Sequence, residues 1–344
     1  MPPYILTLLM VVPLALVSAV TVQAMIAWPI LDHPDARKSH TRPTPKGGGV
    51  GPVLAFIVGM LVFYHFSTLA ETRFTAVVAA AVAIAAVALA DDLKDFSFLV
   101  KLGAQALAAV VAMATGLALK TLALPGIGEV ELGIVGLAIT LFWIVGCTNA
   151  VNFMDGLDGL VTGVVVIASA TLAVIAALNE SWFAHAAAMF LLAGFAGFLP
   201  FNWNPARIFM GDVGSQFAGF MLAVLGVAAA AFEASQVSFL IVPLLLFGLL
   251  FDATFTLARR ALAGERVSAP HRSHLYQMAQ RTGVPVRVVA GLHWGFALFQ
   301  AALAFLFLDL APADKPWVVV PALAVQLVWA AYVIRRMRRF GESW

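Results

Sequence analysis

The chain has 344 residues, of which 62% are hydrophobic and only 11% are charged, and its mean hydropathy is +0.97. Soluble domains carry about 25% charged residues, so this composition excludes an ordinary soluble protein and indicates a lipid bilayer as the main solvent. The net charge of +2 argues against a nucleic-acid partner, and the single cysteine, Cys147, excludes an intrachain disulfide.

Apolar stretches recur along the whole chain, and a membrane-spanning helix needs roughly 20 mostly apolar residues. The first stretch is too long for a signal-peptide core and lacks a basic leader, so we interpret it as a membrane helix. The candidate spans are residues 4–28, 50–66, 74–90, 102–119, 132–146, 160–178, 182–198, 217–232, 237–257, 288–308 and 317–334. We therefore expect an all-α, polytopic membrane bundle of about 11 transmembrane helices, with 10 as the alternative, forming one domain over residues 1–344.

The basic residues divide between the two sets of loops. Loops after odd-numbered spans and the C-terminal tail contain all 20 Lys and Arg residues except Arg73, Lys120 and Lys315. Positively charged loops remain in the cytoplasm. The N-terminus is therefore predicted to be periplasmic and the C-terminus cytoplasmic, and the polar clusters described next all fall on the cytoplasmic side.

The first inner loop, residues 33–49, contains His40, several basic residues and three consecutive glycines that end at Gly49. Glycines let a backbone approach a ligand closely, and basic side chains bind phosphate. The alternative is an ordinary positively charged loop that ends in flexible glycines.

The second cluster consists of Asp91 and Asp92, followed by Lys94, Lys101 and Gln105. Adjacent carboxylates at the inner end of an apolar helix are costly to hold near lipid unless a cation or metal accompanies them. They then serve as Mg²⁺ partners or as a base, and a nearby lysine can hold a phosphate. The alternative is an acidic, solvated loop.

The third cluster contains Asn149, Asn152, Asp155 and Asp158, with Gly156 beside Asp155. Asn152 and Asp155 lie three residues apart and share a face if this stretch is helical. Many oxygen ligands in a short stretch suit a hard cation, but the spacing is not that of an EF-hand loop.

The fourth cluster contains Trp203, Arg207, Phe209 and Asp212. Asp212 stands next to a glycine, so its carboxylate can reach a ligand. Phe209 and Trp203 could stack on a base, although Trp203 also suits the membrane interface, and Arg207 could hold a phosphate.

The fifth cluster lies in the longest inner loop and contains His271, Arg272 and His274. Two histidines three residues apart could bind zinc, but no third ligand is evident nearby, and the arginine between them favours phosphate. Asp252, upstream of Arg259 and Arg260, is explained equally well by a local ion pair or by catalysis.

In combination, these motifs resemble the polyprenyl-phosphate N-acetylhexosamine-1-phosphate transferase family. They run in the order Asp-Asp-x-x-Lys, Asn-x-x-Asn-x-x-Asp-Gly-x-Asp-Gly, Phe-Met-Gly-Asp-x-Gly-Ser and a His/Arg loop, and the likeness extends to about Gln280. That family includes the phospho-N-acetylmuramoyl-pentapeptide translocase and the enzymes that initiate O-antigen, enterobacterial common antigen and teichoic-acid linkage.

The resemblance implies a Mg²⁺-dependent enzyme, with Mn²⁺ as a substitute, that transfers HexNAc-1-phosphate from a UDP-sugar to undecaprenyl phosphate and releases UMP. It implies Asn152 and Asp212 as metal ligands, and Asp91, Asp92, Lys101 and Asp155 as catalytic residues. The implied substrate-binding residues are His40, Gly156, Leu157, Asp158, Asn202, Phe209, His271, Arg272 and His274. A homodimer, direct attack by the lipid phosphate and a phospho-aspartate intermediate all stay open.

One departure from the family concerns the last loop. The pentapeptide translocase has three consecutive histidines there, whereas this chain has His271-Arg-Ser-His274. The loop is therefore closer to the O-antigen-initiating branch, and a muramoyl-pentapeptide substrate is the alternative. A membrane transporter is the alternative from another class, but it would place charged groups near the centres of several helices, whereas here they gather at one face.

Overall fold

The computed structural model describes residues 3–32, 43–67, 72–94, 96–124, 128–231, 237–269, 271–311 and 313–344. His40, a predicted substrate-binding residue, lies outside the described residues. The helices are α1 Pro3–Ala27, α2 Val50–Phe66, α3 Thr72–Lys94, α4 Phe98–Met113, α5 Gly133–Met154, α6 Leu160–Leu178, α7 Trp182–Asn202, α8 Gly211–Ala231, α9 Ile241–Leu245, α10 Phe247–Leu262, α11 Leu275–Arg281, α12 Val286–Asp309, the 3-10 helix η1 Lys315–Val318 and α13 Val319–Phe340.

The protein is a polytopic helical membrane protein. In the described part of the chain, 8 helices are long and apolar enough to cross a bilayer, and α2 and α4 are shorter apolar helices. The predicted span 237–257 is divided between α9 and α10, which meet at Leu246. Each predicted span thus corresponds to helical structure, while the count of about 11 and the orientation in the membrane stay predictions.

The prediction of an all-α chain needs a small correction. β1 (Ile30–Asp32) pairs antiparallel with β2 (Thr44–Lys46), and β3 (Thr121–Leu124) pairs antiparallel with β4 (Gly128–Glu131). These ribbons lie between helices, in stretches too polar to span a bilayer, where antiparallel pairing satisfies backbone groups that no helix satisfies. The first ribbon fixes the two ends of the first inner loop next to each other.

Helix α8 forms the centre of the bundle, because 94% of its most apolar window lies inside the protein. It packs against α3 and α5. Small residues allow this close packing: a Cβ added at Gly219 would lie 2.8 Å from Thr148 Cα of α5. Asp212 is in the first turn of α8, so the most deeply embedded helix carries the carboxylate of the fourth cluster.

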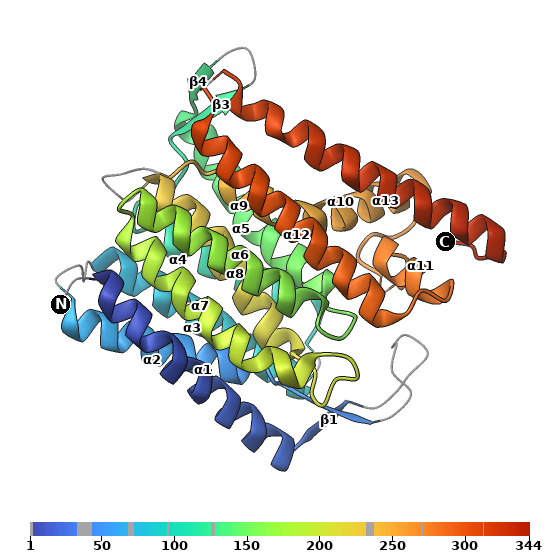
Figure 1. Ribbon diagram of the computed structural model, residues 1–344, viewed down its shortest axis with the longest axis horizontal. Coiled ribbons are helices and arrows are strands. Elements are labelled where there is room, and N and C mark those ends of the chain that lie inside the picture. Colours follow the sequence, from blue (N-terminus) through green and yellow to red (C-terminus); the bar gives the residue numbers. More distant parts are fainter. Residues whose placement is uncertain are drawn as a thin grey trace.

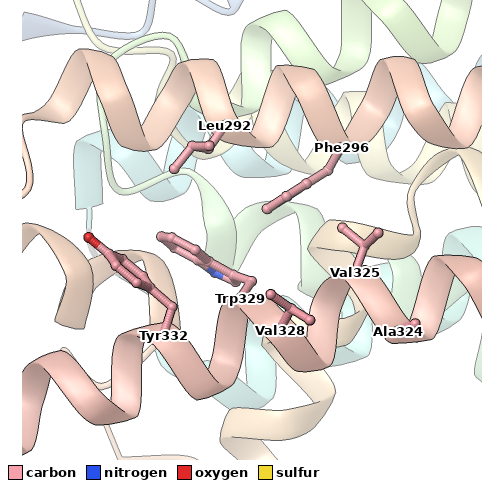
Figure 2. A pocket seen from close by; sticks show the side chains of 7 residues that line it. All are labelled: Leu292, Phe296, Ala324, Val325, Val328, Trp329 and Tyr332. Carbon is pink, nitrogen blue, oxygen red and sulfur yellow. The ribbon is translucent and has the colours of Figure 1, made fainter.

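Different elements of the chain lie at the two ends of the bundle. Figure 1 shows β1, α11 and the C-terminus at one end and the N-terminus at the other. The helices α12 and α13 stand at the edge of the bundle, and an apolar pocket of about 390 Å³ opens between them. Figure 2 shows Leu292 and Phe296 of α12 facing Trp329 and Tyr332 of α13 across this pocket.

Candidate functional site

One large cavity brings together residues from all five sequence clusters. Its volume is about 1540 Å³, and Lys46 from the end of the first inner loop lines it. The lining also includes Asp91, Asp92, Lys101, Asn152, Asp155, Gly156, Leu157, Asp158, Asn202, Phe209, Asp212, His271, Arg272 and His274. The structure therefore places every predicted site residue that it describes around one space, although their roles stay predictions.

Lys101 connects two acids that are far apart in the sequence. Its Nζ lies 2.6 Å from Asp91 Oδ2 and 3.3 Å from Asp212 Oδ2. Asp91 is buried and also accepts a 2.7 Å hydrogen bond from the backbone N–H of Phe96. A buried carboxylate with a lysine and an amide as partners keeps a fixed orientation. Asp91 of α3 and Lys101 of α4 thus both lie next to the first turn of α8, which carries Asp212.

Asp92 contacts backbone groups of α8, whereas its neighbour Asp91 contacts the Lys101 side chain. Its carboxylate accepts the backbone N–H groups of Asp212 at 3.3 Å and Val213 at 3.2 Å, and Lys46 Nζ lies 3.8 Å away. The first N–H groups of a helix have no partner within the helix, and a carboxylate satisfies them well. Asp92 is therefore an N-terminal cap for α8 supplied by α3.

Asp212 is held by three side chains. Besides Lys101, Asn152 Nδ2 donates to Oδ1 at 3.1 Å and Gln216 Nε2 donates to Oδ2 at 3.0 Å. Gln216 belongs to none of the sequence motifs, although its position one helical turn after Asp212 places both side chains on the same face of α8. Asn152 also donates to Ser215 Oγ at 2.9 Å, so α5 and α8 are connected at the site.

Asp155 lies in the turn after α5 and is surrounded by negative charge. Burial, together with the neighbouring carboxylates Asp212, Asp92 and Asp158, raises its pKa to about 8. A divalent cation would relieve this excess, so the donor set fits Mg²⁺. In the described part of the chain no three His, Cys, Asp or Glu side chains form a ready metal cage. That is compatible with Mg²⁺, which binds through one or two carboxylates and completes its shell with substrate and water oxygens.

Asp158 and Asn202 brace the turn that precedes α6. Asp158 Oδ2 accepts from Asn204 Nδ2 at 2.7 Å and from the Ala206 N–H at 3.0 Å. Asn202 Oδ1 accepts the Gly159 N–H at 3.1 Å. Gly159 has a φ of +72°, which favours glycine. These two residues are among the predicted substrate-binding residues, and both line the cavity.

The histidine loop also lines the cavity, through His271, Arg272 and His274. The ring centroids of His271 and His274 are 4.9 Å apart. Burial, together with the nearby His274, Arg260 and Arg259, lowers the pKa of His271 to about 4. His271 is therefore uncharged at neutral pH. Positive charge for a phosphate at this wall comes from Arg272, which lines the same cavity.

The structure removes one of the two alternatives for Asp252 and places Arg207 away from the cavity. Arg259 and Arg260 pair with Glu265, at 3.2 and 2.9 Å, and not with Asp252, whose carboxylate lies 3.2 Å from His274 Nδ1. Arg207, which could have held a phosphate, does not line the cavity, and its guanidinium lies 5.3 Å from the ring centroid of Phe201. The folded chain thus pairs Asp252 with His274, and places the Arg207 guanidinium over the Phe201 ring.

Trp203 was considered either as a base-stacking residue or as an interfacial one. Its ring centroid lies 4.8 Å from that of Trp294 in α12, whose Nε1 donates to Gly159 O at 3.0 Å. Trp203 does not line the cavity. It therefore packs behind the cavity wall, where it supports the turn before α6 and leaves Phe209 as the lining aromatic residue of the fourth cluster.

Comparison with known proteins agrees with this geometry. Residues 74–230 match Glycosyl transferase family 4, a region that includes Asp91, Asn152 and Asp212. The chain is 32% identical over 286 residues to the probable undecaprenyl-phosphate N-acetylglucosaminyl 1-phosphate transferase of Bacillus subtilis (strain 168), an alignment that covers 83% of this chain and 77% of that protein. It is 31% identical to the decaprenyl-phosphate N-acetylglucosaminephosphotransferase of Mycobacterium tuberculosis (strain CDC 1551 / Oshkosh), over 89% of this chain and 82% of that protein.

A third relative shares a shorter region. The phospho-N-acetylmuramoyl-pentapeptide-transferase of Enterococcus faecalis (strain ATCC 700802 / V583) is 44% identical over 107 residues, which is 31% of this chain and 33% of that protein. Similarity over most of the chain and the clustering of the motif residues in one cavity lead to the same conclusion. The chain belongs to the family of polyprenyl-phosphate N-acetylhexosamine-1-phosphate transferases, within Glycosyl transferase family 4.

Proposed function

We propose that this protein transfers a HexNAc-1-phosphate group from a UDP-sugar to undecaprenyl phosphate, releases UMP and thereby initiates O-antigen or another cell-envelope polysaccharide. One observation supports the proposal most directly: acids and lysines from distant parts of the chain line a single cavity of about 1540 Å³. Both reactants carry phosphate and repel each other, so an enzyme that joins them must supply positive charge around a fixed geometry.

The border of this cavity suits a lipid acceptor. Leu93, Phe98 and Phe142 line it, and their side chains are 60%, 42% and 80% exposed. These exposed apolar side chains can contact an isoprenoid tail, while the lining residues Lys101 and Asp91 are less exposed, with side chains 27% and 4% accessible. A polyprenyl phosphate would keep its tail in the bilayer and place its phosphate beside Lys101.

The reaction is a substitution at phosphorus. An oxygen of the polyprenyl phosphate forms a bond to the β-phosphorus of the UDP-sugar, the bond from that phosphorus to the bridging oxygen breaks, and UMP leaves with that oxygen and the electron pair. Lys101 and Arg272 would neutralise the charge that builds up, and Asp91 would orient the acceptor phosphate through Lys101. Asn152 and Asp212 would hold Mg²⁺, whose chemistry there is to neutralise the pyrophosphate of the donor.

The names of the relatives suggest which sugar donors to test first. Two of them are named for the transfer of N-acetylglucosamine phosphate, so UDP-GlcNAc is the first donor to test. The shorter match to a muramoyl-pentapeptide transferase makes UDP-MurNAc-pentapeptide the second donor. UDP-GalNAc and the UDP forms of 6-deoxy-HexNAc sugars such as FucNAc or QuiNAc complete the panel.

The test is incubation of the purified protein with undecaprenyl phosphate, Mg²⁺ and each UDP-sugar. We expect UMP release together with a product that partitions into organic solvent, for one HexNAc donor above the others. UMP release without a lipid product, or no release with any donor, contradicts the proposal. Exchange of labelled UMP into the UDP-sugar without acceptor would support a phospho-aspartate intermediate, whereas direct attack predicts no exchange.

The location of the site follows from the same proposal. We place the cavity at the cytoplasmic face of a bacterial inner membrane. Most basic residues lie in the same set of loops as the clusters that line the cavity, and positively charged loops remain in the cytoplasm. UDP-sugars are also cytoplasmic metabolites. Cysteine labelling tests the orientation, because Cys147 is buried and leaves the surface free of native thiols. The introduced thiol of Ser268→Cys should react with a reagent added from the cytoplasmic side, and that of Asp314→Cys with one added from the periplasmic side. The reverse result contradicts the orientation.

A further inference from the structure

Asp252 is a buried acid at the back of the histidine loop. It lies in α10 and is 1% exposed. Its Oδ1 accepts from the backbone N–H of Leu275 at 2.9 Å and from Thr256 Oγ1 at 3.2 Å, and lies 3.2 Å from His274 Nδ1. Its Oδ2 accepts from the backbone N–H of Tyr276 at 3.0 Å. Four donors around one carboxylate compensate for the loss of water around a buried charge.

This arrangement determines which nitrogen of His274 is free. A histidine that donates from Nδ1 to a carboxylate has its ring orientation fixed, so its other nitrogen, Nε2, is the one available elsewhere. His274 lines the cavity together with His271 and Arg272, and no hydrogen bond of Nε2 occurs among the described residues. The Asp252 contact therefore leaves Nε2 as the atom that faces the cavity.

The same carboxylate also fixes the loop against the turn after α5. Tyr276, whose N–H is bound to Asp252, donates its Oη to the carbonyl oxygen of Phe153 at 3.0 Å. A Cβ added at Gly156 would lie 2.2 Å from that hydroxyl, so only glycine allows this approach. Asp252 is thereby connected to the turn that carries Asp155, through a single tyrosine.

We propose that Asp252 is a positioning residue: it orients His274 so that Nε2 points at the phosphates of the sugar-nucleotide donor. This inference rests on the proposed function for the identity of the ligand, while the Asp252–His274 link itself does not. Asp252 is buried behind His274 and does not line the cavity, so it acts through the histidine and not by contact with substrate.

The first test measures the link without turnover. In ¹⁵N-histidine-labelled protein, the Nδ1 and Nε2 resonances of His274 are assigned by their loss in His274→Asn. We expect a protonated Nδ1 in the native protein, and a shift of both resonances in Asp252→Asn, which keeps the size of the side chain and removes its charge. Unchanged His274 resonances in Asp252→Asn would overturn the inference, whether or not the protein transfers sugar phosphates.

The second test measures catalysis. In Asp252→Asn, kcat/KM for the UDP-sugar should fall about 10–100-fold, as it does for carboxylates that orient histidines at metal sites, while KM for undecaprenyl phosphate stays within about threefold. A general defect in folding would change the kinetic constants for both substrates. The matched control is Thr256→Val, which removes another hydrogen bond from the same buried carboxylate without affecting His274. It should retain nearly native kinetics.

The double variant separates positioning from simple support. If Asp252 acts through His274, adding Asp252→Asn to His274→Asn should cause less than about threefold further loss, because the histidine that it orients is already absent. Additive losses would show that Asp252 only supports the fold and would overturn the inference. Wild-type protein without transferase activity but with the expected His274 resonances would refute the proposed function and leave the positioning role intact.

Discussion

Asp92 Oδ1 lies 3.3 Å from the backbone nitrogen of Asp212, so one acid of the site caps the helix that carries the other. The two residues are 120 positions apart in the sequence. Asp91, beside Asp92, pairs instead with Lys101 at 2.6 Å. The neighbouring carboxylates thus perform separate tasks: Asp92 fixes the start of α8, and Asp91 orients the lysine that faces the cavity.

Replacement of Asp92 with Ala should therefore lower stability as well as turnover. Loss of an N-terminal cap costs about 0.5–2 kcal/mol, and here two backbone N–H groups lose their acceptor. The unfolding free energy in detergent measures this loss. The control is Lys94→Ala at the end of the same helix, an exposed side chain whose removal should change stability by less than about 0.5 kcal/mol. Equal stability of both variants would contradict the capping role.

Asp212→Asn should nearly abolish transfer while the protein still folds. The asparagine keeps the shape of the side chain but removes the charge that Lys101 and a metal ion require, and removal of one electrostatic group in an active site costs about 10²–10³ in kcat. Product formation by the purified variant measures the effect. Asp314→Asn, at an exposed position outside the cavity, should behave like the native protein. Near-normal turnover of Asp212→Asn would refute the assignment.

Removal of divalent metal should silence the enzyme. The excess of carboxylates around Asp155 fits a site that is completed by a cation, so EDTA should stop UMP release and Mg²⁺ or Mn²⁺ in excess should restore it. EDTA already saturated with Mg²⁺ is the control for effects of the chelator itself. Undiminished turnover in free EDTA would eliminate the metal from the mechanism.

Gly49 should tolerate no side chain. A Cβ at this position would lie 2.3 Å from Gly214 Cα, and backbone cannot move aside as a side chain can. Its φ of −61° is normal for any residue, so the cost of Gly49→Ala comes from the clash alone and should reach about 1–3 kcal/mol. Gly103→Ala, where an added Cβ contacts nothing within 4 Å, should stabilise α4 by about 0.5–1 kcal/mol.

The single cysteine provides the measurement for these two glycine variants. Cys147 is 1% exposed, so a thiol-reactive dye reports unfolding when this side chain reaches solvent. Gly49→Ala should unfold at a lower temperature than the native protein, and Gly103→Ala at the same or a higher one. If Gly49→Ala unfolded at the native temperature, Gly49 could not lie against Gly214 of α8 as closely as the structure shows.

His271 should make stability sensitive to acid. Its pKa is about 4 in the folded protein, below its ordinary value of 6.5, so between these values the unfolded chain binds the additional proton. The contribution of His271 to stability is therefore complete above about pH 6.5 and decreases as the pH falls toward 4. His271→Gln should flatten this part of the stability profile. A profile that the substitution leaves unchanged would contradict the lowered pKa.

Much of the fold follows from the pattern of hydrophobic residues. A helix in lipid satisfies its own backbone, so each long apolar run predicts a helix without reference to its neighbours. The division at Leu246 was not predicted, because the residues around this point are apolar on both sides; α9 and α10 both pack against α12. The β1–β2 ribbon was also missed, because its strands are only 3 residues long.

The sequence predicted which residues form the candidate site, and the tertiary structure decided which partners they have. Costly carboxylates at the inner ends of apolar helices, such as Asp91 and Asp212, identify themselves, because lipid tolerates them only where they have a use. That Asp92 caps α8, and that Asp252 binds His274 and not the nearby Arg259, depends on contacts between distant segments. Sequence proximity did not indicate these contacts, since each carboxylate was paired by the packing of α3 on α8 and of α11 on α10.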